Sequence, residues 1–317
     1  YTKHPKGSLL STVYLPCINR ISTVVGSGKS VGKMVGSRAK NMRKSERMKE
    51  VNGIQSDKGR AAAYALVTGA SSGMGYCYAR ALAKKGYNLL IVSNEDAIYD
   101  KADLLRKDFG VAVEALMQDL GQPSSAKDLY NYCVEHKIDV EVLVNNAGVY
   151  HDRDFLDDTE RFNELILNLH VVTPAMLCYY FGQQMAACGR GYILNVCSVT
   201  SHIAVQRLAT YAATKAFLTL FTRSLHVELR GKGVIVTNIS PGAVDTGLYH
   251  IRPWATHLGK ALGYIVTPEY IVGRALRGMF RGRAKVSVPC VWNAVLVGLV
   301  ALIPTGLLRL IRRFGWF

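Results

Sequence analysis

The chain has 317 residues, enough for one large core with appendages, and carries a formal net charge of +16 at pH 7. Residues 1–60 hold thirteen Lys/Arg and three acidic residues, so +10 of that excess lies there. The rest of the chain is only mildly basic, which argues against a nucleic-acid partner. The seven cysteines are odd in number and form no Cys-x-x-Cys pair, so they predict no metal cluster and favour a reducing, cytoplasmic compartment.

Residues 1–60 are predicted to be a flexible basic arm, and attachment to a membrane surface or a partner is the alternative. The apolar stretch 9–25 is interrupted by Asn19 and Arg20. It is therefore too short and too polar to span a bilayer.

From residue 61 the pattern becomes regular. Apolar runs predict buried strands at 63–67, 89–92, 111–116, 140–144, 192–196 and 234–239. Amphipathic stretches between them predict helices at 75–85, 99–109, 125–136, 155–185 and 208–230. Strands that alternate with helices indicate an α/β fold with a doubly wound parallel sheet, here as a single domain over 61–288.

The first predicted strand runs into a glycine-rich turn. It reads Thr68-Gly69-Ala70-Ser71-Ser72-Gly73-Met74-Gly75. Glycines permit a tight turn and let backbone N–H groups approach a pyrophosphate, which the N-terminus of the following helix stabilises. The turn therefore predicts a dinucleotide site, although its Gly-x-x-x-Gly-x-Gly spacing differs from Gly-x-Gly-x-x-Gly.

A tyrosine and a lysine, Tyr211 and Lys215, are four residues apart in the last predicted helix and share one of its faces. A nearby ammonium favours the phenolate and lowers the pKa of a tyrosine. Ser198 follows the strand 192–196, at the edge of the sheet where sites of parallel α/β proteins form. Taken alone, the Tyr-x-x-x-Lys spacing is more often that of a surface pair, so the surrounding motifs decide its meaning.

Several motifs together resemble the short-chain dehydrogenase/reductase family over about residues 61–288. They are the glycine spacing, Asn145-Asn146-Ala147-Gly148, the Ser198, Tyr211 and Lys215 set, and Pro241-Gly242-Ala243-Val244-Asp245-Thr246. The resemblance implies a Rossmann-like fold that binds a nicotinamide dinucleotide and transfers hydride between an alcohol and a carbonyl.

The resemblance also implies a role for each catalytic residue. Tyr211 would be the general acid/base, and Lys215 would lower its pKa and hold the nicotinamide ribose. Ser198 would stabilise the substrate oxygen, and Asn168 would complete a proton relay. An ordinary helix asparagine is the alternative for Asn168, which lies inside the predicted helix 155–185.

The cofactor contacts implied by the resemblance extend along the sheet edge. They are Gly69, Ser71, Ser72, Gly73, Met74, Gly75, Ser93, Asn94, Asp119, Leu120, Asn146, Ala147, Gly148, Tyr211, Lys215, Pro241, Gly242, Val244 and Thr246. Asp119 has the alternative of a simple helix cap. Asn145 is expected to stabilise the sheet instead of touching the chemistry.

The choice between NAD and NADP depends on the tip of the second strand. A carboxylate there would bind the ribose 2′-OH of NAD, and an arginine just beyond it would bind the 2′-phosphate of NADP. This chain has Ser93 and Asn94, with Glu95 and Asp96 next. The missing tip carboxylate slightly favours NADP over NAD, although the nearby acids leave the phosphate weakly countered.

The C-terminal segment 289–317 forms a hydrophobic tail with basic residues near its end. No charge occurs over 286–308, but Pro289 and Pro304 divide the stretch, so an interfacial helix or a cover for the substrate cleft is favoured over a membrane span. A helix packed on the domain or in a dimer is the alternative. The tail resembles those of relatives that act on steroids or long-chain acyl ketones. The aromatic residues Tyr249 and Trp254 suit a lipophilic substrate and ordinary packing equally well.

The sequence therefore predicts an NAD(P)-dependent oxidoreductase that acts on a hydrophobic ketone or secondary alcohol, such as a hydroxysteroid or a 3-oxoacyl thioester. We expect a homo-oligomer in the cytoplasm, with peripheral membrane attachment through the tail as an extension. The rival hypothesis is a dinucleotide-binding regulatory or membrane-associated scaffold protein without catalysis.

Overall fold

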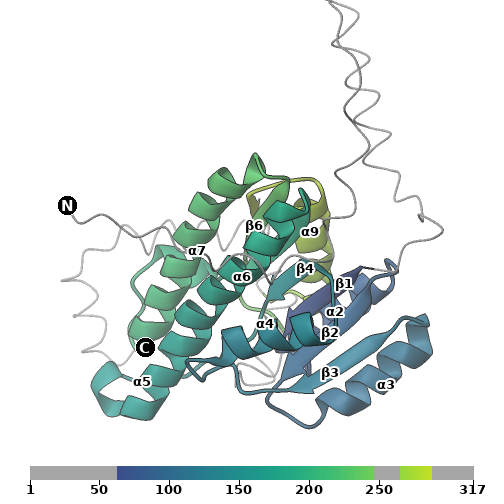
Figure 1. Ribbon diagram of the computed structural model, residues 1–317. Coiled ribbons are helices and arrows are strands. Elements are labelled where there is room, and N and C mark those ends of the chain that lie inside the picture. The colour runs from purple at the N-terminus through teal and green to yellow at the C-terminus, as the bar shows by residue number, and fades with distance from the viewer. Residues whose placement is uncertain (1–62, 246–264, 288–317) are drawn as a thin grey trace, which may run out of the picture. The chain divides into compact units, whose positions relative to one another are not determined.

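The computed structural model describes residues 63–245 and 265–287, which form a seven-stranded, wholly parallel sheet (Figure 1). The strand order is β3-β2-β1-β4-β5-β6-β7. The strands are β1 (Tyr64–Thr68), β2 (Asn88–Ser93), β3 (Val113–Met117), β4 (Val140–Asn145), β5 (Gly191–Val196), β6 (Val234–Ser240) and β7 (Lys285–Ser287). The doubly wound α/β fold predicted from the sequence is confirmed.

Helices cover both faces of the sheet (Figure 1). One face packs against α2 (Gly73–Ala83), α3 (Ile98–Phe109) and α9 (Pro268–Phe280). The other packs against α4 (Ser125–Glu135), α6 (Thr173–Ala187) and α7 (Ala209–Arg230). Because both faces are covered, the strands are apolar on both sides: Val67 enters the first core and its neighbour Leu66 the second.

The strand order reverses between β1 and β4. The chain moves outward from β1 to β2 and β3, then returns to place β4 on the other side of β1. The carboxyl ends of β1 and β4 therefore diverge into loops that leave a crevice, which is the usual position of a ligand in such sheets.

A buried asparagine pair fixes the register of two central strands. Asn145 and Asn195 are opposite each other on β4 and β5. The Asn145 side-chain amide donates to Asn195 Oδ1 over 2.8 Å, and Asn195 Nδ2 donates to Thr222 Oγ1 of α7 over 2.9 Å. The structural role expected for Asn145 agrees with these contacts.

The helical stretch predicted over 155–185 is confirmed from Glu160 to Ala187, and the structure adds that it is not one uniform α-helix. The structure divides this region into a short turn (η2, Phe155–Asp157), α5 (Glu160–Leu167), a π-helical turn (η3, Asn168–Val172) and α6. Thr159 caps α5 by accepting a hydrogen bond from Phe162 N. Pro174, at the start of α6, has no N–H to continue the α-helical pattern back to residue 170, which accounts for a change of helix type there.

Among the described residues, one helical stretch, Glu160–Ala187, is long and apolar enough to cross a membrane by composition. Its side chains Leu177, Phe181 and Met185 are fully buried in the second core. Packing against the sheet therefore explains its apolar character.

The described cysteines Cys77, Cys133, Cys178 and Cys197 are free thiols. The predicted basic arm, the segment 246–264 and the C-terminal tail lie outside the described residues.

Candidate active site

The glycine-rich turn between β1 and α2 packs its backbone against neighbouring loops. Gly69 has φ of +64°, a conformation that residues with a side chain rarely adopt. A Cβ on Gly69 would lie 2.8 Å from Ala147 Cα, and one on Gly75 would overlap the carbonyl oxygen of Gly69. These glycines therefore allow a close approach of three backbone segments that no other residue would permit.

Hydrogen bonds from Thr68 and Asn146 join this turn to the loop after β4. Thr68 Oγ1 accepts from the backbone N–H of Asn146 and of Ala147, each over 3.0 Å. The Asn146 side chain donates back to the carbonyl oxygens of Thr68 and Gly69 over 3.0 and 3.1 Å. The crevice at the strand reversal therefore has a firmly bonded floor.

A cavity of about 420 Å³ lies over this floor, within the range typical of small-molecule and cofactor sites. Most of the residues predicted to bind a dinucleotide line it. They are Gly69, Ser71, Ser72, Gly73, Met74, Gly75, Ser93, Asn94, Asp119, Leu120, Asn146, Ala147 and Gly148. Additional lining residues that the motifs did not identify are Glu95, Gln118, Val149, Leu165 and Leu169.

The end of this cavity at the tips of β2 and β3 is lined by hydroxyl and carboxylate groups. Ser93 Oγ donates to Ser71 Oγ over 3.0 Å and accepts from Glu95 N over 3.2 Å. Asp119 accepts from Gly121 N over 2.9 Å, so it caps a turn as well as lining the cavity. No Lys or Arg occurs among the described residues that line this cavity.

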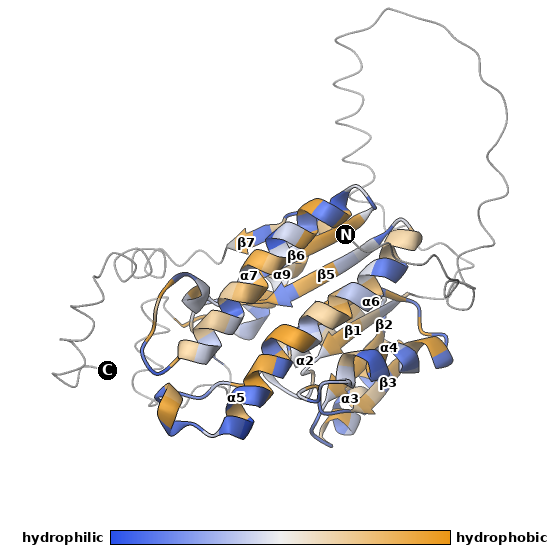
Figure 2. Ribbon diagram, turned by 60° about the vertical axis from the view of Figure 1, so that its left-hand side comes forward, coloured by the Kyte–Doolittle hydropathy of each residue, from blue (hydrophilic) through white to orange (hydrophobic). Residues whose placement is uncertain are grey.

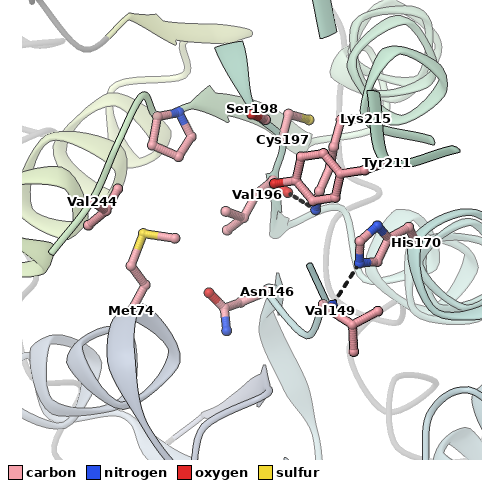
Figure 3. A pocket seen from close by; sticks show the side chains of 12 residues that line it. Met74, Asn146, Val149, His170, Val196, Cys197, Ser198, Tyr211, Lys215 and Val244 are labelled. Carbon is pink, nitrogen blue, oxygen red and sulfur yellow. Dashed lines mark hydrogen bonds between the residues drawn. The ribbon is translucent and has the colours of Figure 1, made fainter. Parts of the chain in front are cut away.

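A second cavity continues from the first and shares Met74, Asn146, Gly148 and Val149 with it. Figure 3 shows its lining, where Tyr211 and Lys215 project from α7 toward a space that Met74 and Asn146 border on the opposite side. Ser198, Pro241 and Val244 also line it. The structure therefore brings three of the four predicted catalytic residues together beside the predicted dinucleotide site.

Ser198 follows β5 and begins a short 3₁₀ turn (η4, Val199–His202). The Ser198 side chain is buried, and its Oγ accepts from Thr200 N over 3.2 Å and from Thr200 Oγ1 over 3.0 Å. Since both contacts use Oγ as an acceptor, the Ser198 hydroxyl proton stays available for an oxygen atom in the cavity.

Lys215 is buried beside Tyr211, and its ammonium nitrogen lies 5.7 Å from the centre of the Tyr211 ring. The Lys215 ammonium donates to the carbonyl oxygen of Val196 at the end of β5 over 3.1 Å. Burial lowers the pKa of Lys215 from 10.5 to about 8, because desolvation disfavours its charged form. Lys215 is therefore still largely protonated at neutral pH but can release a proton just above it.

An apolar group surrounds the opposite side of Tyr211. Tyr150 contacts its ring edge-on with the ring centres 5.4 Å apart, and Val149, Val205 and Leu208 pack in the same cluster. Apolar side chains also line the cavity itself, namely Met74, Val149, Val196, Pro241 and Val244, so a carbonyl group next to Tyr211 would have hydrocarbon near its substituents.

Asn168 is half-buried at the first position of the π-helical turn, and it is not among the residues that line the described cavities. His170, two residues later, is buried and lines the cavity of Tyr211 and Lys215 (Figure 3). Two positions differ by about 200° around an α-helix, so the helix pattern alone left open which of them faces inward.

The remaining predicted cofactor residues differ in outcome. Tyr211, Lys215, Pro241 and Val244 line the smaller cavity. Gly242 is buried next to Pro241 but lines neither cavity, and Thr246 lies outside the described residues.

Comparison with known proteins agrees with this geometry. The family model described as short chain dehydrogenase matches residues 63–253. A very-long-chain 3-oxoacyl-CoA reductase of Coprinopsis cinerea is 32% identical over 239 residues, which cover 74% of this chain and 70% of that protein. A protein of the same name from Anas platyrhynchos is 28% identical over 77% of this chain and 76% of its own.

A solved structure is also similar in fold. The short-chain dehydrogenase from Sphingobium yanoikuyae, determined in complex with NADPH, is 28% identical to this chain. It aligns with a TM-score of 0.64 over 76% of this chain and 96% of its own.

Proposed function

We propose that this chain, which belongs to the short-chain dehydrogenase family and is a nicotinamide-dependent oxidoreductase of lipophilic ketones or alcohols, acts on 3-oxoacyl thioesters. The observation that carries the proposal is the convergence of Ser198, Tyr211 and Lys215 at the end of a dinucleotide-sized cavity. The names of the two similar reductases support the acyl substrate, and the apolar cluster beside Tyr211 is consistent with it.

The residues present fit a nicotinamide dinucleotide. Gly69 and Gly75 leave the turn free of side chains where a pyrophosphate would approach, and the N-terminus of α2 follows directly. When bound, the nicotinamide supplies or accepts the hydride. Asn146, Gly148 and Val149 line both cavities and so would hold its reactive end beside Tyr211.

Each catalytic side chain has a distinct proposed task during ketone reduction. Negative charge develops on the carbonyl oxygen in the transition state, and preorganised donors at that oxygen lower the barrier. Ser198 would donate the hydrogen that its contacts with Thr200 leave unused. Tyr211 would transfer its proton to the same oxygen, and the Lys215 ammonium would favour the resulting phenolate.

The charge of the larger cavity favours NAD(H), contrary to the slight preference for NADP(H) predicted from the missing tip carboxylate. A 2′-phosphate at the tip of β2 would meet the Glu95 carboxylate and no cation from the described lining residues. A 2′-hydroxyl would instead meet groups that hydrogen-bond neutral oxygens, namely Ser71, Ser93 and Asn94. We therefore propose that NADH binds at least as tightly as NADPH.

Self-association is proposed through the outer surface of α6 and α7, which lie side by side over the sheet (Figure 2). Phe217, Leu220 and Val227 of α7 and Tyr179 of α6 are large apolar side chains that are exposed there. Large apolar side chains exposed on two neighbouring helices are consistent with an interaction surface on a soluble protein. Light scattering of the wild type and of Leu220→Glu tests this proposal, which predicts a dimer for the first and a monomer for the second.

Membrane attachment through the tail remains a proposal that rests on the composition of 289–317. Liposome flotation of the full chain and of a chain lacking 289–317 tests it. Equal flotation of the two proteins would remove the tail from consideration.

A substrate panel tests the activity itself. We expect purified protein to oxidise NADH with 3-oxoacyl-CoA substrates, with kcat/KM rising as the acyl chain lengthens, and to reduce sugar ketones poorly. Steroid ketones are assayed in the same panel, because they distinguish an acyl thioester reductase from an enzyme that acts on steroids. Faster turnover of the steroid than of every acyl substrate would contradict the acyl assignment, and failure to bind either dinucleotide would contradict the proposed function as a whole.

A further inference from the structure

His170 connects three separate segments of the active site through its two ring nitrogens. Nε2 accepts a hydrogen bond of 3.0 Å from the backbone N–H of Val149, in the loop after β4 (Figure 3). Nδ1 lies 3.2 Å from the Thr214 hydroxyl of α7. The imidazole itself belongs to the π-helical turn between α5 and α6.

The direction of these hydrogen bonds fixes the tautomer of His170. Thr214 Oγ1 donates to the carbonyl oxygen of Tyr211 over 2.8 Å, so its oxygen is left to accept from His170 Nδ1. Nδ1 must therefore carry the proton. The Val149 N–H independently requires that Nε2 carry none. Both contacts are satisfied by one neutral form, protonated at Nδ1 only.

The surroundings of His170 disfavour its charged form. His170 is 1% exposed, and its burial, followed by the charge of Lys215, lowers its pKa well below 6.5. The titratable groups that share its cavities are Lys215, Tyr211 and Cys197. A second ring proton would also point at the Val149 N–H, so protonation would break the contact with the loop.

The loop that His170 holds is the one that joins the two cavities. Gly148 and Val149 line both of them, and a Cβ on Gly148 would lie 2.8 Å from His170 Nε2. The glycine therefore lets the loop lie directly against the imidazole. On the other side, Thr214 lies in the helix turn that contains Tyr211 and precedes Lys215.

We infer that His170 is a neutral positioning residue, which holds the Gly148–Val149 loop at a fixed distance from Tyr211. The inference rests on the proposed function, since it concerns the geometry of the same reaction. His170 acts through the loop and the helix, so it is not itself assigned a proton transfer.

Substitutions at His170 test this inference. His170→Leu removes both hydrogen bonds, and we expect kcat to fall by about 100-fold, the loss typical of a small misplacement of reacting groups. Since glutamine offers an oxygen acceptor to Val149 N–H and an amide donor to Thr214, His170→Gln should recover most of that loss. The exposed His136 on the surface next to α4 provides the matched control, and His136→Leu should retain wild-type kcat.

The pH dependence separates a positioning role from simple loss of packing. Wild-type kcat/KM should fall at acid pH as His170 takes up a second proton, whereas His170→Gln has no such group and should lose that acid decline. Nitrogen NMR of labelled histidine in the wild type should show a protonated Nδ1 and a bare Nε2.

Two results would overturn the inference while leaving the proposed function intact: a bare Nδ1, or wild-type turnover in His170→Leu. Dinucleotide binding by the wild type, measured by fluorescence, is recorded in the same series. Its absence would contradict the proposed function instead of the role of His170.

Discussion

The Lys215 ammonium donates to the carbonyl oxygen of Val196 over 3.1 Å, which attaches the second turn of α7 to the end of β5. Ser198 lies two residues beyond that carbonyl, and Tyr211 lies one helical turn before Lys215. A single buried hydrogen bond therefore helps to set the relative positions of the Ser198 and Tyr211 hydroxyl groups, which would contact a substrate oxygen.

The buried Lys215 should make stability increase with pH. Its pKa is about 8 in the folded chain and about 10.5 when unfolded, so between these values the unfolded chain binds more protons and the free energy of unfolding rises. The rise amounts to about 3 kcal/mol when complete. Urea unfolding of the dinucleotide-free protein from pH 8 to pH 10.5 measures it, and Lys215→Met should lack that increment. Parallel curves for the two proteins would contradict a lowered pKa of Lys215.

Tyr211→Phe should remove proton transfer while leaving the cavity shape intact. We expect kcat to fall by about 100- to 10,000-fold, the usual contribution of general acid–base catalysis, with dinucleotide affinity nearly unchanged. Steady-state kinetics and a binding titration measure both. The same substitution at the exposed Tyr99 of α3 is the control. Retention of most turnover by Tyr211→Phe would remove Tyr211 from the mechanism.

Gly75→Ala should weaken both folding and dinucleotide binding, because its Cβ would overlap the Gly69 carbonyl. Overpacking of this kind costs about 1–3 kcal/mol of unfolding free energy. Gly231→Ala is the matched control, since a Cβ there meets no atom within 4 Å. Urea unfolding and an NADH titration measure the two effects. Wild-type stability and binding in Gly75→Ala would show that Gly75 does not lie against the Gly69 carbonyl as described.

Asn94→Arg should change the cofactor preference. An arginine at the tip of β2 could hydrogen-bond a 2′-phosphate, and a hydrogen bond to a charged group corresponds to a gain of about tenfold or more in NADPH affinity relative to NADH. Asn131→Arg, on the exposed side of α4, adds the same charge away from the cavity. Titration of each variant with both dinucleotides gives the ratio. An equal shift in Asn131→Arg would indicate a general charge effect and not a local contact.

The sequence predicted the sheet well, because a parallel strand buried on both faces is a continuous apolar run. The strand predicted at 140–144 corresponds to β4, which extends one residue further, to Asn145. The strand predicted at 192–196 corresponds to β5, which begins one residue earlier, at Gly191. The short β7 and the helix α9 were not predicted as separate elements. The apolar run of β7 is too short to recognise, because the strand has only three residues. The amphipathic pattern of α9 follows a segment of mixed composition.

The prediction of the site was less complete where local geometry departs from regular periodicity. Glycine spacing predicted the turn at 69–75 that lines the dinucleotide-sized cavity, because the close approach there depends on backbone conformation, and the family motifs supplied its other predicted residues. The π-helical turn at Asn168–Val172 has no such signature in a uniform helical pattern, so the contacts of His170 were not predicted, and the role of Asn168 stays a prediction. Pro174 was the available signal, because a proline four residues after His170 cannot supply the next helical N–H.

The hydrogen bonds from Asn145 to Asn195 and from Asn195 to Thr222 have a consequence for how the site keeps its alignment. Asn146, Ser198 and Tyr211 are carried by the three elements β4, β5 and α7 that these amides join. A slip of β5 by one residue would turn Asn195 toward the opposite face and break both bonds at once. These side-chain hydrogen bonds therefore favour the one register of β4, β5 and α7 that brings Asn146, Ser198 and Tyr211 to the same edge of the sheet.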